Sequence, residues 1–475
     1  MNINKRKNKF IAAFFIYIIG FLWLLVVSSM LQTTEEALKL FNTCIIAYLI
    51  IGACILAHIV SNGGDVFEPL TVITILYALL FVFEPMIDIY EENLSWFGGN
   101  YTVYGVKGTW IAIIGYISFF IGYKIRRFRV MSTRKHYRNL LEKSRVDQYE
   151  NVQYYAKVGI IFWIVCYILS VMFLLLSGKS LVFILTGGMT GSGELLETRK
   201  LLGALSMFSY SLVGAWMLYF VYGKKRPLKI ITFILTIFIY YIRGYRFIII
   251  IFVLAPIVFL YLLKNKRPKL IAIIGAVFIM ILFVGFVAVA RNSVRYGGGV
   301  SSDMLNWEAA FEQVKDNFRI YKTYYALVGY VPEKTSFLHG RQIFLYTALM
   351  FVPRLIWRAK PDTADGLYLI KKAVSNSAFL SGTAYPIIGE YYIEFGILGV
   401  IILMFLYGYL NKNWLKKYGY STTKIDLIMY SILLLSNFQI VIRGYTPSNF
   451  YMVIFFVLPI VLIKMNTRKN KIWKK

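Results

Sequence analysis

Long apolar runs recur along the whole chain and limit what it can fold into. About twelve of them approach the length of roughly 20 residues at which a helix crosses a bilayer. They lie at roughly 10–31, 43–60, 70–88, 109–123, 158–177, 201–222, 230–242, 247–263, 270–290, 386–410, 427–442 and 449–465. The pattern predicts an all-α, polytopic membrane protein with about twelve transmembrane helices.

Composition agrees with this class and argues against others. Hydrophobic residues make up 59% of the 475 positions, far above a soluble domain. The net charge of +29 comes from short basic clusters between apolar runs, which is how topology signals are distributed, so no nucleic-acid partner is expected. The cysteines, Cys44, Cys54 and Cys166, lie inside apolar runs without disulfide or metal-ligand spacing.

The basic clusters also predict how the chain is oriented. Lys5, Arg6, Lys7 and Lys9 place the N-terminus in the cytoplasm, and twelve spans then return the C-terminus to the same side. Later basic clusters fall on segments that this order assigns to the cytoplasm. One of them, the loop 124–157, is suited to an amphipathic helix on anionic headgroups.

One long segment, 291–395, separates the ninth and tenth apolar runs and is expected outside the membrane, opposite the cytoplasm. Loops of roughly a hundred residues between helices are usually functional. The segment contains a shorter apolar run, 343–357, which as a helix would be about 22 Å long at 1.5 Å per residue. That is too short to cross, so we expect a re-entrant or interfacial element.

Arginines occur at the outward ends of the spans, where the positive-inside bias disfavours them. Pairs spaced four apart share one face of a helix and could hold an anion. Interfacial snorkelling is the alternative for any single arginine. These residues are Arg243, Arg246, Arg291, Arg295, Arg354, Arg358 and Arg443.

Two glutamates, Glu390 and Glu394, lie four residues apart at the outer end of the tenth run. Glu390 could act as a general base, although the helix dipole alone also favours a glutamate in a first turn. Asp362 and Asp365 resemble turn residues rather than metal ligands, and we predict no metal site. His339 stands alone, without the partners of a Ser-His-Asp arrangement.

Four short motifs resemble those of Wzy-type O-antigen and capsule polymerases. Residues 351–361 read FVPRLIWRAKP, and residues 388–399 read IGEYYIEFGILG. Residues 243–246, RGYR, and 443–444, RG, are similar to the outward arginine positions of that family. The resemblance divides the chain into N-terminal transmembrane helices, 1–200, and a polymerase-like core, 201–475. Arg358 departs from the pattern, because proline is commoner after the tryptophan.

The resemblance implies a GT-C-like membrane glycosyltransferase in the bacterial cytoplasmic membrane. It would polymerise undecaprenyl-pyrophosphate-linked repeat units into O-antigen or capsule at the outer face, without metal or cofactor. A chain-length regulator and a flippase would be its protein partners. Glu390, Arg354 and Arg291 would be catalytic. Substrate would be held by Arg243, Arg246, Arg295, Arg358, Arg443, His339 and Tyr391.

Two further points remain open at this stage. Trp357, Tyr324, Tyr325 and Tyr391 could stack on sugars or could belong to an interfacial aromatic belt.

An O-antigen-ligase-like transferase would use similar machinery. A lipid-linked oligosaccharide flippase would instead show internal repeats and short loops on both faces. A structural scaffold would leave the outward arginines without a purpose.

Overall fold

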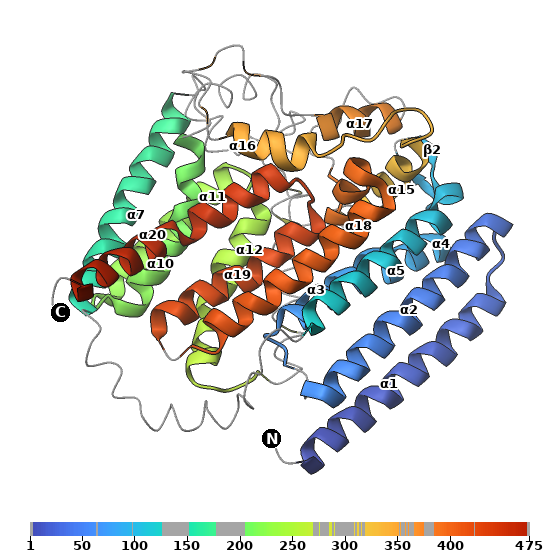
Figure 1. Ribbon diagram of the computed structural model, residues 1–475, viewed down its shortest axis with the longest axis horizontal. Helices are drawn as coiled ribbons and strands as arrows, with labels where there is room; N and C mark the ends of the chain where they lie inside the picture. The colour runs from blue at the N-terminus through green and yellow to red at the C-terminus, as the bar shows by residue number, and fades with distance from the viewer. Residues whose placement is uncertain are drawn as a thin grey trace.

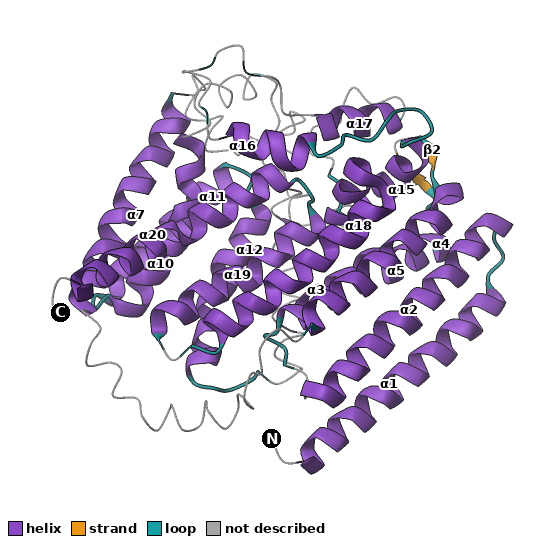
Figure 2. Ribbon diagram, viewed as in Figure 1, coloured by secondary structure: helices purple, strands orange, loops and turns teal. Residues whose placement is uncertain are grey.

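The computed structural model describes residues 3–62, 65–125, 152–176, 205–268, 319–350, 365–374 and 384–472, apart from 97 and 422, with isolated residues between 275 and 315 and at 352, 357 and 360. Within these residues the chain is almost wholly helical, and its strands form one short hairpin (Figure 2). The all-α prediction is confirmed.

The N-terminal half consists of long helices and that hairpin. A π-helical turn, η1, joins α3 to α4, and the hairpin strands pair antiparallel with Ser95 opposite Asn100. The elements are α1 (Ile3–Met30), α2 (Glu35–Asn62), α3 (Pro69–Ala78), η1 (Leu79–Phe83), α4 (Glu84–Tyr90), β1 (Ser95–Trp96), β2 (Gly99–Asn100), α5 (Thr102–Lys124) and α7 (Val152–Leu175).

The second half alternates long helices with short ones. Its elements are η3 (Phe208–Tyr210), α10 (Ser211–Tyr222), α11 (Arg226–Ile242), α12 (Arg246–Leu263), α15 (Ile320–Tyr330), η5 (Arg341–Tyr346), α16 (Thr347–Met350), α17 (Asp365–Ala373), α18 (Ile387–Trp414), η6 (Leu415–Gly419), α19 (Lys424–Ile442) and α20 (Thr446–Ile472). Local signals set several starts: prolines occupy the first turns of α3 and α11, and the Thr423 side chain caps α19.

Ten helical segments among the described residues are long and apolar enough to cross a membrane. They match ten of the twelve predicted spans. The predicted span 230–242 is the 17-residue helix α11, and the predicted span 270–290 lies outside the described residues apart from four isolated positions. The multi-pass prediction is therefore confirmed.

Helices α5 and α18 pack closely and join the two halves of the chain. Their glycines allow backbone to approach backbone: a Cβ at Gly122 would lie 2.1 Å from the carbonyl oxygen of Phe405, and a Cβ at Gly408 would lie 2.1 Å from that of Phe119. Small residues are what allow such approach between membrane helices. The first turn of α18 lies against α5 as well, because a Cβ at Gly115 would be 2.7 Å from the Ile388 Cδ1.

The short helices gather at one end of the bundle. Figure 1 shows α16 and α17 lying across this end near the start of α18, with the marked N- and C-termini away from it. The segment 291–395 contributes α15, η5, α16 and α17 to this end. The candidate site is built here.

Candidate active site

The centre of the site is Glu390, in the first turn of α18, whose side chain is fully buried. Its Oε1 accepts hydrogen bonds from the Gln342 Nε2 at 2.7 Å and the Thr446 backbone N–H at 2.8 Å. Its Oε2 accepts from the Thr446 hydroxyl at 2.6 Å. Because Thr446 begins α20, the carboxylate also caps the positive end of that helix dipole.

Gln342 connects the segments around Glu390, and nothing in the sequence pattern pointed to it. Its buried amide Nε2 also donates to the Tyr385 hydroxyl at 2.7 Å, and its Oε1 accepts the Gly366 N–H at 3.0 Å. A Cβ at Gly366 would lie 2.4 Å from that Oε1, so α17 can approach only with glycine there. One side chain thus links η5, α17 and α18.

Glu394, one turn further along α18, holds the chain before η5. Its fully buried carboxylate accepts the backbone N–H of Gly340 at 2.6 Å and that of Gln342 at 2.9 Å. The Glu394 carbonyl accepts the His339 N–H at 2.9 Å, because α18 is broken just beyond, at Gly396. Gly340 and Gly396 have φ of +84° and +65°, where glycine is favoured. Glu394 therefore fixes the backbone of Gly340 and Gln342 to α18, and we call these two hydrogen bonds the Glu394 clamp.

An ion pair forms the exposed rim of this site. Arg341, 58% exposed at its side chain, lies 3.2 Å from the carboxylate of Asp365, which also accepts the Tyr346 hydroxyl at 2.6 Å. Burial, with the Asp365 carboxylate beside it, raises the pKa of Tyr346 above its usual range. Asp365, expected in a turn, is the first residue of α17, while Asp362 lies outside the described residues.

The predicted arginine pair at the α11–α12 turn is buried. The Arg243 guanidinium donates to the Ser206 carbonyl at 2.9 Å and to the Tyr245 hydroxyl at 2.8 Å. It lies over the rings of Phe173 and Tyr245, with centroids 4.8 and 4.7 Å away. Arg246 begins α12 and is also buried. Arg243 thus has contacts that hold the turn in place.

Arg443, at the end of α19, meets the same turn. Its guanidinium lies over the Phe247 ring, 4.8 Å from the centroid. Phe247 directly follows Arg246 in the sequence. The next residue, Gly444, donates its N–H to the Tyr385 carbonyl at 2.7 Å. The structure therefore brings Arg246 and Arg443, predicted from separate motifs, to the end of the bundle that holds Glu390.

The structure describes only some of the remaining predicted residues. Arg291, Arg295, Arg354 and Arg358 lie outside the described residues. His339 has a left-handed φ of 51°, and its ring packs on Phe337. The run 343–357 begins as η5 and α16, and Trp357 beyond them is 40% exposed.

Three of the four predicted aromatic contacts are buried. Tyr324 and Tyr325 pack against α5. The Tyr324 hydroxyl donates to the Gly108 carbonyl at 2.9 Å, and the Tyr325 hydroxyl lies 2.8 Å from the Thr109 hydroxyl. Both rings are buried in the packing of α15 against α5, and neither is exposed at the surface. Tyr391 on α18 is buried as well.

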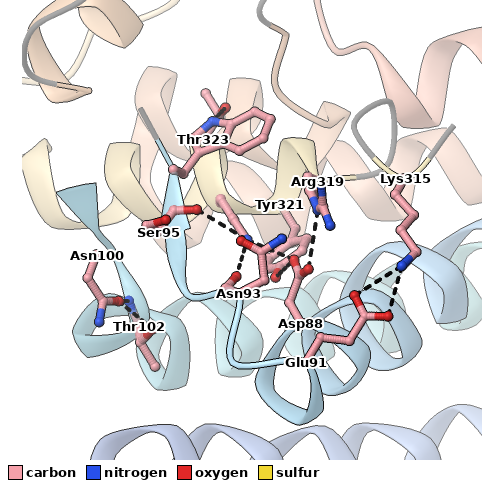
Figure 3. A network of polar contacts seen from close by, with 12 residues as sticks. Asp88, Glu91, Asn93, Ser95, Asn100, Thr102, Lys315, Arg319, Tyr321 and Thr323 are labelled. Carbon is pink, nitrogen blue, oxygen red and sulfur yellow. Dashed lines mark hydrogen bonds and ion pairs between the residues drawn. The ribbon is translucent and has the colours of Figure 1, made fainter. Parts of the chain in front are cut away.

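A second buried network fixes α15 to the N-terminal half (Figure 3). The Asp88 carboxylate, 1% exposed, lies 3.2 Å from the Arg319 Nε and 2.9 Å from the Lys322 Nζ, and accepts the Tyr321 hydroxyl at 2.5 Å. Lys322 also donates to the Asn93 carbonyl at 2.5 Å. Burial, with Asp88 beside it, raises the pKa of Tyr321 well above its usual range. Sequence reading missed this network entirely.

The arrangement combines a buried carboxylate with cations at the same end of the bundle. A carboxylate held by neutral donors can accept a proton, and cations at a membrane edge can bind a phosphate. A family model described as O-antigen polysaccharide polymerase Wzy matches residues 9–471, nearly the entire chain. The match includes the N-terminal half, where the motifs showed no resemblance. No curated protein and no solved structure matches the chain. The chain therefore belongs to the O-antigen polysaccharide polymerase Wzy family.

Proposed function

We propose that this chain is a metal-independent glycosyltransferase that joins undecaprenyl-pyrophosphate-linked repeat units at the outer face of the bacterial cytoplasmic membrane. The observation that carries the proposal is the Glu390 carboxylate, which is buried between Gln342 and Thr446. It lies at the end of the bundle where Arg443 packs on Phe247, the residue after Arg246. The family supports a polymerase in general. Its substrate, face and chemistry belong to the proposal.

In the proposed reaction, a hydroxyl of the acceptor repeat unit attacks the anomeric carbon of the donor glycan. A new glycosidic bond forms, the bond from that carbon to the pyrophosphate oxygen breaks, and lipid pyrophosphate leaves with the bonding electrons. The hydroxyl proton passes to Glu390. Cationic side chains stabilise the leaving pyrophosphate, as charged donors do wherever negative charge develops. Arg246 and Arg443 are the described candidates, and Arg291, Arg295 and Arg354 would join them.

Access to Glu390 requires one of its donors to give way. Thr446 belongs to a long helix, whereas Gln342 lies on η5 in the segment that also carries the exposed ion pair between Arg341 and Asp365. We propose that η5 shifts when substrate binds, so that the acceptor hydroxyl replaces Gln342 at Oε1 while Thr446 keeps Oε2. Such loop movements commonly complete an active site.

The function is tested first in cells. A strain lacking the chain should carry surface glycan with a single repeat unit on its lipid carrier, and the wild-type chain should restore the ladder of longer chains. A strain without any surface-exposed units would point to a flippase and would overturn the proposal.

Metal independence is tested with the purified chain. Given lipid-linked repeat units, it should polymerise at an unchanged rate in excess chelator. In the proposed site, neutral hydrogen-bond donors hold Glu390, and arginines, rather than a metal ion, stabilise the leaving pyrophosphate. A rate that falls in chelator and returns with magnesium or manganese would contradict this part of the proposal.

A further inference from the structure

Helices α10 and α11 form a hairpin with an open hollow near its turn. The hollow has a volume of about 300 Å³, is open on one side, and is lined by Trp216, Phe220, Arg226, Lys229, Ile230 and Phe233. α11 runs from this hollow to the α11–α12 turn, which Arg443 contacts at the end of the bundle that holds Glu390. Its 17 residues are about 26 Å long at 1.5 Å per residue. The hollow is therefore at the opposite end of the bundle from Glu390.

The floor of the hollow is aromatic and fixed in place. Trp216 stacks on Phe220 with centroids 5.0 Å apart, and its ring lies 5.2 Å from that of Phe233. The Trp216 Nε1–H donates to the Lys229 carbonyl at 3.2 Å, which ties α10 to α11. Ile230, at the edge, is 60% exposed and extends the apolar surface along α11. The floor is therefore an ordered apolar surface.

The rim of the hollow is cationic. Arg226 is exposed in the first turn of α11, and the Lys229 Nζ lies over the Phe220 ring and donates to the Phe220 carbonyl at 2.6 Å. Lys224 and Lys225 precede them, and the segment 223–229 contains no acidic residue. The amino end of α11 adds its own partial positive charge. An anion is therefore favoured beside an apolar groove.

We propose that this hollow binds one anionic phospholipid of the leaflet opposite the candidate active site. Its phosphate would lie between Arg226 and Lys229, and one acyl chain would cover Trp216, Phe220 and Phe233. Basic pockets between membrane helices recognise anionic headgroups in this way. The fixed floor and the paired cations distinguish the hollow from the ordinary lipid-facing surface of α11, which exposes isoleucines such as Ile231 and Ile234.

The test uses the purified full chain in detergent and native mass spectrometry. Phosphatidylglycerol and phosphatidylcholine with identical acyl chains are titrated against the wild type, the rim variant Arg226→Gln/Lys229→Gln, and the control Lys264→Gln/Lys266→Gln. The control removes the same charge from exposed lysines at the end of α12, which lies at the same end of the bundle but outside the hollow.

We expect the wild type to hold one phosphatidylglycerol at least about tenfold more tightly than phosphatidylcholine, the rim variant to lose that preference, and the control to keep it. Equal binding of the two lipids by the wild type, or equal losses in both variants, would overturn the proposal. If the rim variant does not fold, Arg226→Gln alone changes only an exposed side chain. It should reduce the preference by about threefold, and an unchanged preference would count against the site.

Discussion

At the scale of single residues, Glu390 and Glu394 have different contacts although they are one turn apart. Their shared helix and spacing could be predicted from the sequence. Their roles could not, because Glu390 meets a residue 56 positions later and Glu394 meets backbone N–H groups 52 and 54 positions earlier. Gln342 was missed for the same reason: its partners lie 24, 43 and 48 positions away.

The pair of glutamates gives the first prediction. Glu390→Gln removes the carboxylate that we propose as the base, but it keeps the size of the side chain and an oxygen for Thr446. Polymerisation by the purified chain should fall on the order of a hundred- to ten-thousandfold, with little change in melting temperature. Glu394→Gln should affect stability more than activity, because its new NH₂ group would face the Gly340 or Gln342 N–H. It should lower the melting temperature more than Glu390→Gln does. Equal activity losses in the two variants would remove the distinction between base and clamp.

The second prediction concerns Gln342. Gln342→Leu is close in size but leaves the Gly366 N–H and one hydrogen-bond site of Glu390 unpaired in a buried place. The free energy of unfolding should fall by about 1 to 3 kcal/mol for each unpaired buried group, measured as a lower midpoint of thermal unfolding. Gln153→Leu, the same exchange at an exposed position in α7, is the control and should leave the midpoint unchanged. A wild-type midpoint for Gln342→Leu would show that η5 does not dock as described.

At the scale of elements, most helices follow from apolar length, but the break within α18 does not. A glycine in an apolar run is tolerated inside a helix, so the sequence 386–410 predicted one continuous span. The break at Gly396, with φ +65° and ψ −153°, depends on the segment 338–342 docking at that point. The run 343–357 is a related case. Its length predicted that it does not cross the membrane. Its start within the π-helical turn η5 could not be predicted, because this turn is held by the Gln342 N–H bond to Glu394 and ends at Thr347.

The third prediction tests this break. A side chain at Gly396 would be strained at the present φ and would bring its Cβ to 3.0 Å from the Phe337 ring. Gly396→Ala should cost about 1 to 3 kcal/mol of stability and lower polymerisation, because relieving the strain straightens α18 and releases the Glu394 clamp. Gly98→Ala is the matched control, since Gly98 has φ +80° in the β1–β2 hairpin with nothing within 4 Å of its Cβ. Similar loss of activity in both variants would mean that strain alone, and not the clamp, is responsible.

At the scale of the whole molecule, the Asp88 network fixes α15 to the N-terminal half. The sequence could not indicate it, because Asp88 lies near the end of an apolar run and its partners come more than 200 positions later. Two buried cations, Arg319 and Lys322, pair with this carboxylate, and Arg319 also lies 3.4 Å from the carboxylate of Glu312. Removing one partner of a buried ion pair is strongly destabilising because the other charge stays buried.

The fourth prediction follows from that dependence. Asp88→Asn should lower stability by about 3 to 5 kcal/mol, seen as loss of folded protein in membranes or a lower unfolding midpoint. Asp88→Asn/Lys322→Met should recover part of the loss, because one unpaired cation is gone. Glu91→Gln removes one of the two carboxylates beside Lys315, whose side chain is 31% exposed, and should cost less than about 1 kcal/mol. Equal effects of Asp88→Asn and Glu91→Gln would show that Asp88 does not anchor the two halves.

The last prediction concerns how the molecule is placed in the membrane. Basic residues cluster beside the chain termini, while α16 and α17 lie at the other end of the bundle. The positive-inside bias therefore predicts that the termini are in the cytoplasm and the site is outside. Lys334, between α15 and η5, and Lys417, in η6, are both exposed and suit cysteine labelling in intact cells. A membrane-impermeant maleimide should label Lys334→Cys directly, and Lys417→Cys only after the membrane is opened. The parent chain sets the background, since Cys44 and Cys166 are buried and Cys54 is half-buried. Labelling of Lys417→Cys in intact cells, with Lys334→Cys protected, would invert the molecule and place Glu390 on the cytoplasmic face, where the proposed outer-face polymerisation could not occur.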